Sequence, residues 1–473
     1  MQESTTIAIT FALYLGVMLF IGVIAWQRTN SMQDYLLGGR RLGSWTAALS
    51  AGASDMSGWL LLGLPGYAYA SGLESIWLAV GLLMGTWLNW QLVATRLREQ
   101  SQAAGNALTL PAFLSAKFET GLPLIRIIAA IFILIFYMFY TSSGLVAAGK
   151  LFQSTFGLPY EWAVTGGLLA VVIYTFIGGF LAVSWTDLVQ SLLMLAALVL
   201  VPLYALDAQP NVFMFPADSP LMSMWTNASG VPLGGLAIIS LMAWGLGYFG
   251  QPHILARFMA ISGPEAVPRA RLIGVSWTAL TLTGAILAGL AGINALAAPL
   301  SGPDTETVFI ELIGMLFHPV PAGLLLAAIL AAIMSTADSQ LLVASSSLTE
   351  DIWRVLFKTN SSEKTRVLIG RLGVLAIAAG AWMLAMVPDS KVLDLVAYAW
   401  AGFGAGFGPA LLLTLYWQGT SRLGVLAGIM TGGVTVIVWK QLDGGLFDVY
   451  EIVPGFMFSM LAIIVFSKLE KRK

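Results

Sequence analysis

A single carboxylate, Asp55, lies near the middle of the otherwise uncharged stretch 44–63. A charge at bilayer depth is costly and usually marks an ion or substrate pathway. The neighbouring small residues Ser54, Ser57 and Gly58 allow a helix to unwind and expose its backbone carbonyls. The alternative is a small-residue packing face with one protonated or paired Asp. We favour an ion-linked role, because intramembrane ionisable residues are functional by default.

A second stretch whose residues could bind a ligand is SLMAWGLGYFGQPHILAR, residues 240–257. Its glycines weaken a helix and Pro252 ends or kinks it, since proline cannot donate to the carbonyl four residues earlier. We therefore expect the carbonyl of Tyr248 to be free for a ligand. Trp244, Tyr248 and Pro252 recur every four residues and so lie along one face. A proline-kinked helix with an aromatic packing face explains these residues equally well.

A third candidate is the adjacent hydroxyl pair Ser335 and Thr336, with Ala332 one turn earlier and Asp338 just beyond. Two hydroxyls and the bared carbonyls of a broken helix can form the oxygen cage that a small hard cation prefers. A monovalent ion needs no further formal charge there. The common alternative is that both hydroxyls bond back to carbonyls of their own helix, and the hydroxyls alone favour that interpretation.

The elements that must position these residues are membrane spans. The chain has 473 residues, of which 58% are hydrophobic and 10% charged, whereas soluble domains carry about 25% charged residues. Cys is absent and only two His are present, which argues against thiol chemistry, disulfides and a histidine metal centre. We see no nucleophile–base pair for an intramembrane enzyme and no basic module for nucleic acid. We expect no enzyme activity.

Hydrophobic runs predict 13 spans in an all-α polytopic membrane protein. They lie near 6–26, 44–63, 66–92, 124–148, 162–182, 185–205, 232–252, 272–297, 321–347, 367–387, 392–416, 421–439 and 450–467. An odd number places the two termini on opposite faces of the membrane. The two interrupted spans are then the second and the seventh, five apart, and paired interrupted spans indicate an inverted-repeat transporter with a midplane site.

The basic residues indicate how the chain is oriented across the membrane. Of the 23 Lys and Arg residues, only Lys150, Lys391 and Lys440 fall on one face, and the rest, Arg257 among them, fall on loops and span ends of the other. Because basic residues accumulate on the cytoplasmic side, we expect the N-terminus outside and the C-terminus in the cytoplasm.

Three motifs carry a resemblance to a known family. Ser54-Asp-Met-Ser-Gly-Trp-Leu60, Trp244-Gly-Leu-Gly-Tyr-Phe-Gly-Gln-Pro-His253 and Met334-Ser-Thr336 resemble those of the sodium/solute symporter family, most closely its bacterial proline-transporting branch. The resemblance covers nearly the whole chain. It implies a LeuT-like fold with a five-plus-five inverted repeat in one transmembrane domain, residues 1–473. Its expected parts are an extra N-terminal helix at 6–26, a first repeat at 44–205, a second repeat at 232–416, and C-terminal helices with a basic tail at 421–473.

The resemblance also implies which residues bind which ligand. Sodium, the cotransported ion, would be bound by the backbone carbonyls of Ala53, Met56 and Ala332 and by the hydroxyls of Ser335 and Thr336. Asp55 would be the acidic residue associated with this ion. L-Proline, or a similar small zwitterion, would contact Ser57, Gly58, Tyr140, Trp244, Tyr248 and Pro252. Asp187 resembles the acidic residue of a second cation site in relatives, although a cap at the cytoplasmic end of its helix explains it equally well.

The implied function is sodium-coupled import of L-proline by alternating access in a bacterial cytoplasmic (inner) membrane. The lipid bilayer is the only other partner implied, with no nucleic acid and no obligatory protein partner. Two alternatives stay open: a sodium symporter for another small amino acid or carboxylate, and a proton-coupled carrier in which Asp55, Asp187 or Asp338 takes up the proton.

Overall fold

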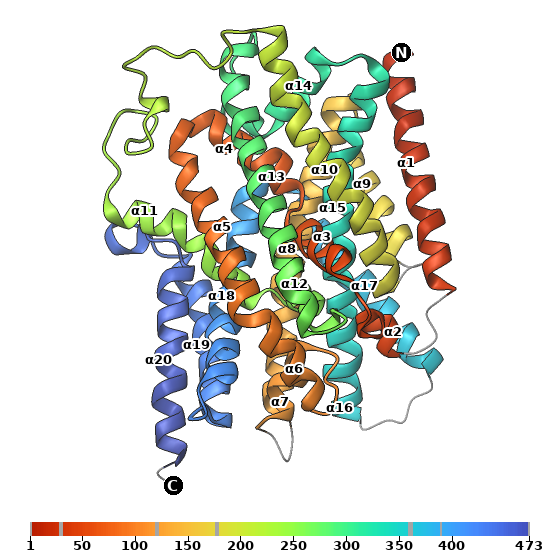
Figure 1. Ribbon diagram of the computed structural model, residues 1–473, viewed down its shortest axis with the longest axis vertical. Helices are drawn as coiled ribbons and strands as arrows, with labels where there is room; N and C mark the ends of the chain where they lie inside the picture. Colours follow the sequence, from red (N-terminus) through yellow and green to blue (C-terminus); the bar gives the residue numbers. More distant parts are fainter. Residues whose placement is uncertain are drawn as a thin grey trace.

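The computed structural model describes residues 2–27, 32–118, 123–175, 179–357, 363–387 and 390–471, and helices account for nearly all of them (Figure 1). Within these ranges the extended pairings are two isolated bridges, one of which joins Leu42 to Ile261. Four basic residues of the orientation argument, Arg28, Lys358, Arg472 and Lys473, lie outside the described residues. The all-α architecture expected from the sequence is therefore observed.

Each expected span has a helical counterpart. In chain order these are α1 (Gln2–Trp26), α3 (Ser44–Asp55) with α4 (Leu64–Ser71), α5 (Ile76–Asn89) with α6 (Thr95–Ala103), α8 (Leu124–Phe156), α9 (Tyr160–Thr175), α10 (Phe180–Ala208), α11 (Gly235–Met242) with α12 (Pro252–Ala260), α13 (Val267–Ala295), α15 (Pro319–Ser346), α17 (Glu363–Ala385), α18 (Val392–Tyr416), α19 (Arg422–Trp439) and α20 (Ile452–Lys471). By length and apolar composition alone, 10 helices of the described residues are long enough to cross a membrane. The expected number of 13 is thus supported only approximately.

One predicted boundary is wrong. The second span continues to Ser71, and the third begins at Ile76 rather than near residue 66. The π-helical turn Trp59–Gly63 leads directly into α4, so the helix passes Pro65 without a stop. The turn instead falls at Gly72, whose φ of 65° suits glycine.

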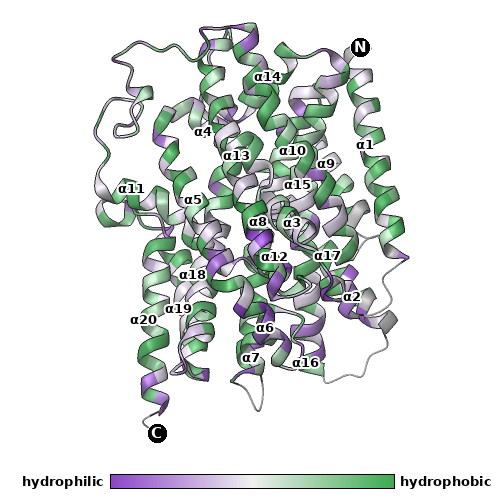
Figure 2. Cartoon of the chain, in the orientation of Figure 1, coloured by the Kyte–Doolittle hydropathy of each residue, from purple (hydrophilic) through white to green (hydrophobic). Residues whose placement is uncertain are grey.

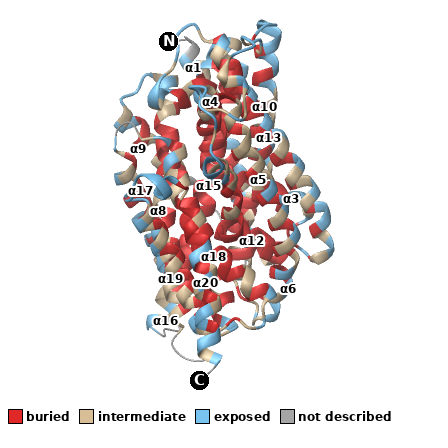
Figure 3. Ribbon diagram, turned by 90° about the vertical axis from the view of Figure 1, so that its left-hand side faces the viewer, coloured by how far each residue is buried: buried red, intermediate tan, exposed pale blue. Residues whose placement is uncertain are grey.

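The most enclosed helix is α15, at the centre of the bundle (Figure 3). In the stretch Pro319–Phe357, which contains α15, 83% of the most apolar 18 residues are buried, against 22% in the corresponding part of α1 at the edge of the bundle. Alanine, glycine, serine and threonine make up more than half of the buried residues of α15, and such small side chains let neighbouring helices approach closely. Hydrophobic residues cover the outer helices, while hydrophilic ones collect mainly at the two ends of the molecule and near α12 (Figure 2).

The two termini lie at opposite ends of the long axis (Figure 1), as the odd number of spans predicts. The two interrupted spans meet in the middle of the bundle. The residue Leu42, just before α3, is tied to the end of α12 and the residues after it by backbone hydrogen bonds, from Leu42 N to Ala260 O at 3.1 Å and from Ser262 N to Leu42 O at 2.9 Å. The proposed repeat boundaries themselves stay a prediction.

Candidate functional site

The helix that carries Asp55 breaks directly after it. Met56 has φ −90° and ψ 78°, outside the helical region, and the Ser57 amide donates to Asp55 O at 3.1 Å across a tight turn. Helical structure resumes with a π-helical turn, Trp59–Gly63, that runs into α4. The small residues predicted this break, and it leaves the last carbonyls of α3 without their usual partners in the next helical turn.

The hydroxyl pair of α15 converges on one of these carbonyls. Ser335 Oγ donates to Ala53 O at 2.9 Å, and Thr336 Oγ1 lies 3.3 Å from the same oxygen. Ser335 Oγ also lies 3.1 Å from Ala332 O, so bonding back within the helix and bonding across to α3 both occur. Both hydroxyls are buried. The structure thus gathers four of the expected ion ligands, two carbonyls and two hydroxyls, between α3 and α15.

Met56 and Asp55 complete the expected ion set. Met56 is expected to bind through its backbone carbonyl, and that role stays a prediction. The side chains of both residues point away from the hydroxyl pair. The Met56 sulfur accepts from Thr281 Oγ1 at 3.7 Å. Tyr248 OH donates to Asp55 Oδ2 at 2.6 Å, and within the described part of the chain this carboxylate has no hydrogen bond to Ser335 or Thr336. The carboxylate therefore faces the second interrupted span, although its backbone lies at the end of α3. Its place in the ion set stays a prediction.

The second interrupted span has the expected form. After α11 the chain follows a 3₁₀ helix from Ala243 to Gly250, Gln251 is extended, and α12 begins at Pro252. The prediction that the Tyr248 carbonyl is free is wrong, because Asn89 Nδ2 of α5 donates to it at 3.0 Å. A side chain from a neighbouring helix satisfies the group that proline leaves unpaired.

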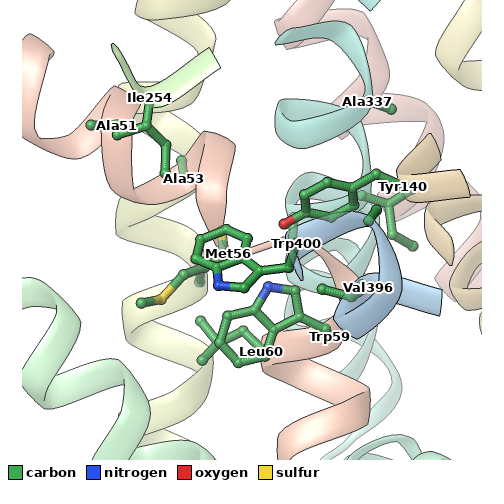
Figure 4. Close-up of a cluster of buried hydrophobic side chains, with 14 of the residues drawn as sticks. Ala51, Ala53, Met56, Trp59, Leu60, Tyr140, Ile254, Ala337, Val396 and Trp400 are labelled. Carbon is green, nitrogen blue, oxygen red and sulfur yellow. The ribbon is translucent and has the colours of Figure 1, made fainter. Parts of the chain in front are cut away.

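Three of the expected substrate residues surround a tryptophan that the sequence did not single out. Trp400 of α18 donates from Nε1 to Trp244 O at 2.7 Å, and its ring meets that of Tyr248 edge-on at 5.0 Å. Tyr140 also meets Trp400 edge-on, at 6.5 Å, and donates to Asp55 O at 2.9 Å. Figure 4 shows Trp59 and Trp400 close to the break at Met56. Aromatic walls with bonded polar tips suit a small ring-bearing zwitterion.

Glycines in the two segments that meet at Trp400 are the feature of the sequence that could have led to this residue. Gly247 leaves no room for a side chain, since a Cβ there would lie 1.8 Å from Trp400 Nε1. The glycine-rich run of α18, AGFGAGFG, is typical of a helix that other backbones approach closely. These glycines could have indicated a close contact between α18 and another element, but the sequence alone does not say which one.

The remaining expected substrate residues do not all join this aromatic group. A Cβ on Gly58 would lie 2.5 Å from Ala147 Cβ, so Gly58 packs against α8. Pro252 lines a separate small cavity together with Leu36 and Phe180. Ser57 is buried at the break of α3, where its hydroxyl lies 3.5 Å from the Trp59 amide. These three assignments stay predictions.

Asp187 lies inside α10, seven residues after its start, so the helix-cap interpretation is wrong. Its Oδ2 accepts from Ser50 Oγ at 2.6 Å, Ser54 Oγ at 3.1 Å and the Arg257 guanidinium at 3.1 Å. All of these side chains are buried. An arginine therefore stands beside the carboxylate at the place where the resemblance implies a second cation.

The position expected for Arg257 is also wrong. The residue was placed among basic residues at the cytoplasmic surface, yet it is 0% exposed. It donates to Ser339 Oγ at 2.6 Å and to His253 O at 2.9 Å as well as to Asp187. The physical reason is that α12 is short, nine residues, and the loop after it turns back to Leu42, which keeps the end of this span inside the bundle.

Comparisons with known proteins identify the family of this chain. The family model described as "Sodium:solute symporter family" matches residues 35–432. The chain is 50% identical to the "Sodium/proline symporter" of Salmonella typhimurium, over all of this chain and 94% of that protein. It is 49% identical to the "High-affinity proline transporter PutP" of Bacillus subtilis, with 95% of each covered.

Solved structures show the same fold. A "Na+-coupled sialic acid symporter" in a substrate-bound outward-open state aligns with a TM-score of 0.78 at 19% identity, covering 98% of both chains. The nucleobase-cation-symport-1 family transporter Mhp1 aligns with a TM-score of 0.55 at 17% identity, over 93% of this chain and 96% of that one. The fold is the expected LeuT-like one, and the relatives are transporters and not enzymes. The chain belongs to the sodium:solute symporter family.

Proposed function

We propose that this protein imports L-proline together with sodium across a bacterial cytoplasmic membrane by alternating access. The observation that carries this proposal is the convergence of Ser335 and Thr336 on the Ala53 carbonyl. It joins the most buried helix to the break in α3 through oxygens alone. The names of full-length relatives at about half identity supply the substrate.

The ion site we propose uses the carbonyls of Ala53, Met56 and Ala332 and the hydroxyls of Ser335 and Thr336. Oxygen ligands suit hard cations, and a site without formal charge suits a monovalent one. In the ion's absence the two hydroxyls bond to the carbonyls directly. A bound ion would accept oxygen lone pairs from both partners and hold α3 against α15, which orders the backbone at the break.

The substrate site we propose is walled by Tyr140, Trp244 and Tyr248, with Trp400 behind them. The aromatic faces would pack on the pyrrolidine ring. Partial charges at the broken helix ends would receive the zwitterion, with amides for the carboxylate and carbonyls for the ammonium. Ser57, Gly58 and Pro252 flank the breaks and complete the proposed contacts. A sugar would need more hydrogen-bonding side chains than these walls offer.

Coupling follows from the shared helix break. Sodium that orders the end of α3 also positions the Asp55 backbone, to which Tyr140 bonds. Each ligand must then raise the affinity of the other by the same factor. The membrane potential contributes about 2.3 kcal/mol per charge for every 100 mV, so inward sodium movement can drive proline accumulation. We place the N-terminus outside and the C-terminus in the cytoplasm.

Uptake in proteoliposomes tests the proposal. We expect labelled L-proline to accumulate only with an inward sodium gradient and to exchange with unlabelled proline in counterflow. Uptake at the same rate without sodium, abolished by a protonophore, would instead support a proton-coupled carrier. One observation favours that second candidate: Asp338 is fully buried, and its Oδ2 has no hydrogen-bond partner among the described residues. If the protein did not take up proline even with a sodium gradient, the substrate would instead be another small amino acid or a carboxylate.

A further inference from the structure

The segment just before α20 contacts the proposed substrate site from outside the expected second repeat. Tyr450 lies in this segment, and its ring stacks on that of Trp244, with centroids 5.4 Å apart and 28° between the planes. Trp244 is 6% exposed, and Tyr450 is partly buried against the same core. Because the expected second repeat ends at residue 416, the sequence did not connect Trp244 with this segment.

Two hydrogen bonds hold Tyr450 in place. Its hydroxyl donates to Ala397 O of α18 at 2.7 Å, and its backbone amide donates to Ser240 Oγ of α11 at 3.1 Å. Figure 1 shows the start of α20 beside α11. One bond fixes the tip of the ring and the other fixes the backbone, so the ring is preorganised, and a preorganised group loses little entropy when a ligand binds.

Glycines of α18 let α20 and the second interrupted span approach the same stretch of that helix. A Cβ on Gly404 would lie 2.6 Å from Ile452 Cδ1 of α20 and 2.8 Å from Gly247 Cα. One turn later, a Cβ on Gly408 would lie 2.7 Å from Phe456 Cε2 of α20. Such glycines allow close helix contacts. The segment before α20 is therefore placed by helix packing and not by its own loop alone.

Trp244 is held by other residues as well. Its carbonyl accepts the hydrogen bond from Trp400 Nε1, and its ring lies 6.4 Å from that of Trp59, with 43° between the planes. Trp59 in turn donates from Nε1 to Asp55 O at 3.2 Å. The carbonyl bond fixes the backbone of Trp244 but not its ring, whose direction depends on the aromatic rings packed against it.

The direction of the Trp244 indole matters because this ring is one of the proposed walls of the substrate site. A hydrophobic site distinguishes substrates that differ by one methylene group by about 10–200-fold. That discrimination depends on walls that do not move. An indole free to tilt would lose contact with the pyrrolidine ring of proline and make room for a larger ring.

We propose that Tyr450 is a positioning residue that holds the Trp244 indole against the substrate and so sets the ring size that the site accepts. The inference rests on the proposed function and adds to the substrate site a residue from the C-terminal helices. Tyr450 acts through the indole and does not itself touch the substrate. The substrate class is a zwitterion with a pyrrolidine ring, and the site discriminates against pipecolate, which has one more ring methylene.

Uptake of labelled proline into proteoliposomes at saturating sodium tests this inference, with pipecolate as the competitor. Tyr450→Leu keeps an apolar side chain but removes the flat ring. It should raise the KM for proline about fivefold with kcat near wild type, because a lost aromatic pair is worth about that factor. The preference for proline over pipecolate should fall as well. Tyr450→Phe keeps the stacked ring and should retain both values, and sodium binding without proline should stay unchanged in both variants.

Phe447→Leu is the matched control and should behave like wild type. Phe447 lies in the same segment but packs edge-on against Trp439 at 4.8 Å, whereas the ring contacts of Trp244 within the described residues are with Trp59 and Tyr450.

Several results would overturn the role given to Tyr450. These are wild-type values in Tyr450→Leu, equal losses in Tyr450→Leu and Tyr450→Phe, or the same change in Phe447→Leu. A parallel loss of sodium binding in Tyr450→Leu would assign the residue to the stability of the fold instead. In each of these cases, sodium-driven proline uptake by the wild type would leave the proposed function standing. A wild type without such uptake would refute the proposed function and this inference together.

Discussion

The buried pair of Asp187 and Arg257 makes a quantitative prediction. Replacing Arg257 by Met keeps most of the side-chain volume and removes the positive charge. The Asp187 carboxylate then keeps only the hydroxyl donors of Ser50 and Ser54. The His253 carbonyl and the Ser339 hydroxyl lose their guanidinium donor as well.

The expected magnitude follows from those contacts. Removing one partner of a buried ion pair costs about 3–5 kcal/mol, because the remaining charge stays desolvated. Two hydroxyls still donate to Asp187, so we expect Arg257→Met to lower the free energy of unfolding by about 3 kcal/mol, at the lower end of that range. Adding Asp187→Leu removes the orphaned charge, and the double variant should recover about 2 kcal/mol of the loss.

The assay is denaturant unfolding in detergent, followed by tryptophan fluorescence, for wild type, both single variants and the double variant. Arg354→Met is the control, because Arg354 is paired with Glu350 but its side chain is 58% exposed. Its loss should change the free energy of unfolding by at most about 1 kcal/mol. The reasoning fails if Arg257→Met costs no more than this control, or if the two single losses simply add in the double variant.

Three further predictions concern the site. Thr336→Ala should raise the sodium concentration for half-maximal uptake at least about tenfold, because losing a ligand worth roughly 1.4 kcal/mol lowers affinity by a factor of ten. Thr336→Ser keeps the hydroxyl and should stay near wild type. Equal sodium dependence in both variants would show that the hydroxyl is not part of the site. Trp400→Phe keeps an aromatic wall but loses the hydrogen bond to the Trp244 carbonyl. Losing about 1 kcal/mol of hydrogen bonding should weaken proline binding roughly fivefold without changing sodium binding. An unchanged proline affinity in equilibrium binding would contradict the role given to Trp400. Gly247→Ala should destabilise the protein by about 1–3 kcal/mol in thermal unfolding, because the new Cβ would clash with the Trp400 indole. Gly43→Ala is the control and should leave stability unchanged, since the space around Gly43 is open. Similar melting temperatures for the two variants would refute the packing argument.

The breaks in the two interrupted spans were predictable from the sequence, because they follow from local residue types. Glycine and serine next to Asp55 weaken α3, and Pro252 forces the start of a new helix. The adjacency of Ser335 and Thr336 is likewise written in the chain. Family motifs at these places then gave the fold and the expected function, and the comparisons confirm the family and the fold.

What the sequence could not give is the direction of each side chain after a break. Asp55 faces Tyr248 rather than the hydroxyl pair, and Arg257 lies inside the bundle rather than at its surface. Trp400 joins the aromatic residues from a helix more than 140 positions away from Trp244. An unwound segment has no periodicity from which to infer a face, so its side chains go where neighbouring helices offer a partner, and only the tertiary structure determines which neighbours those are.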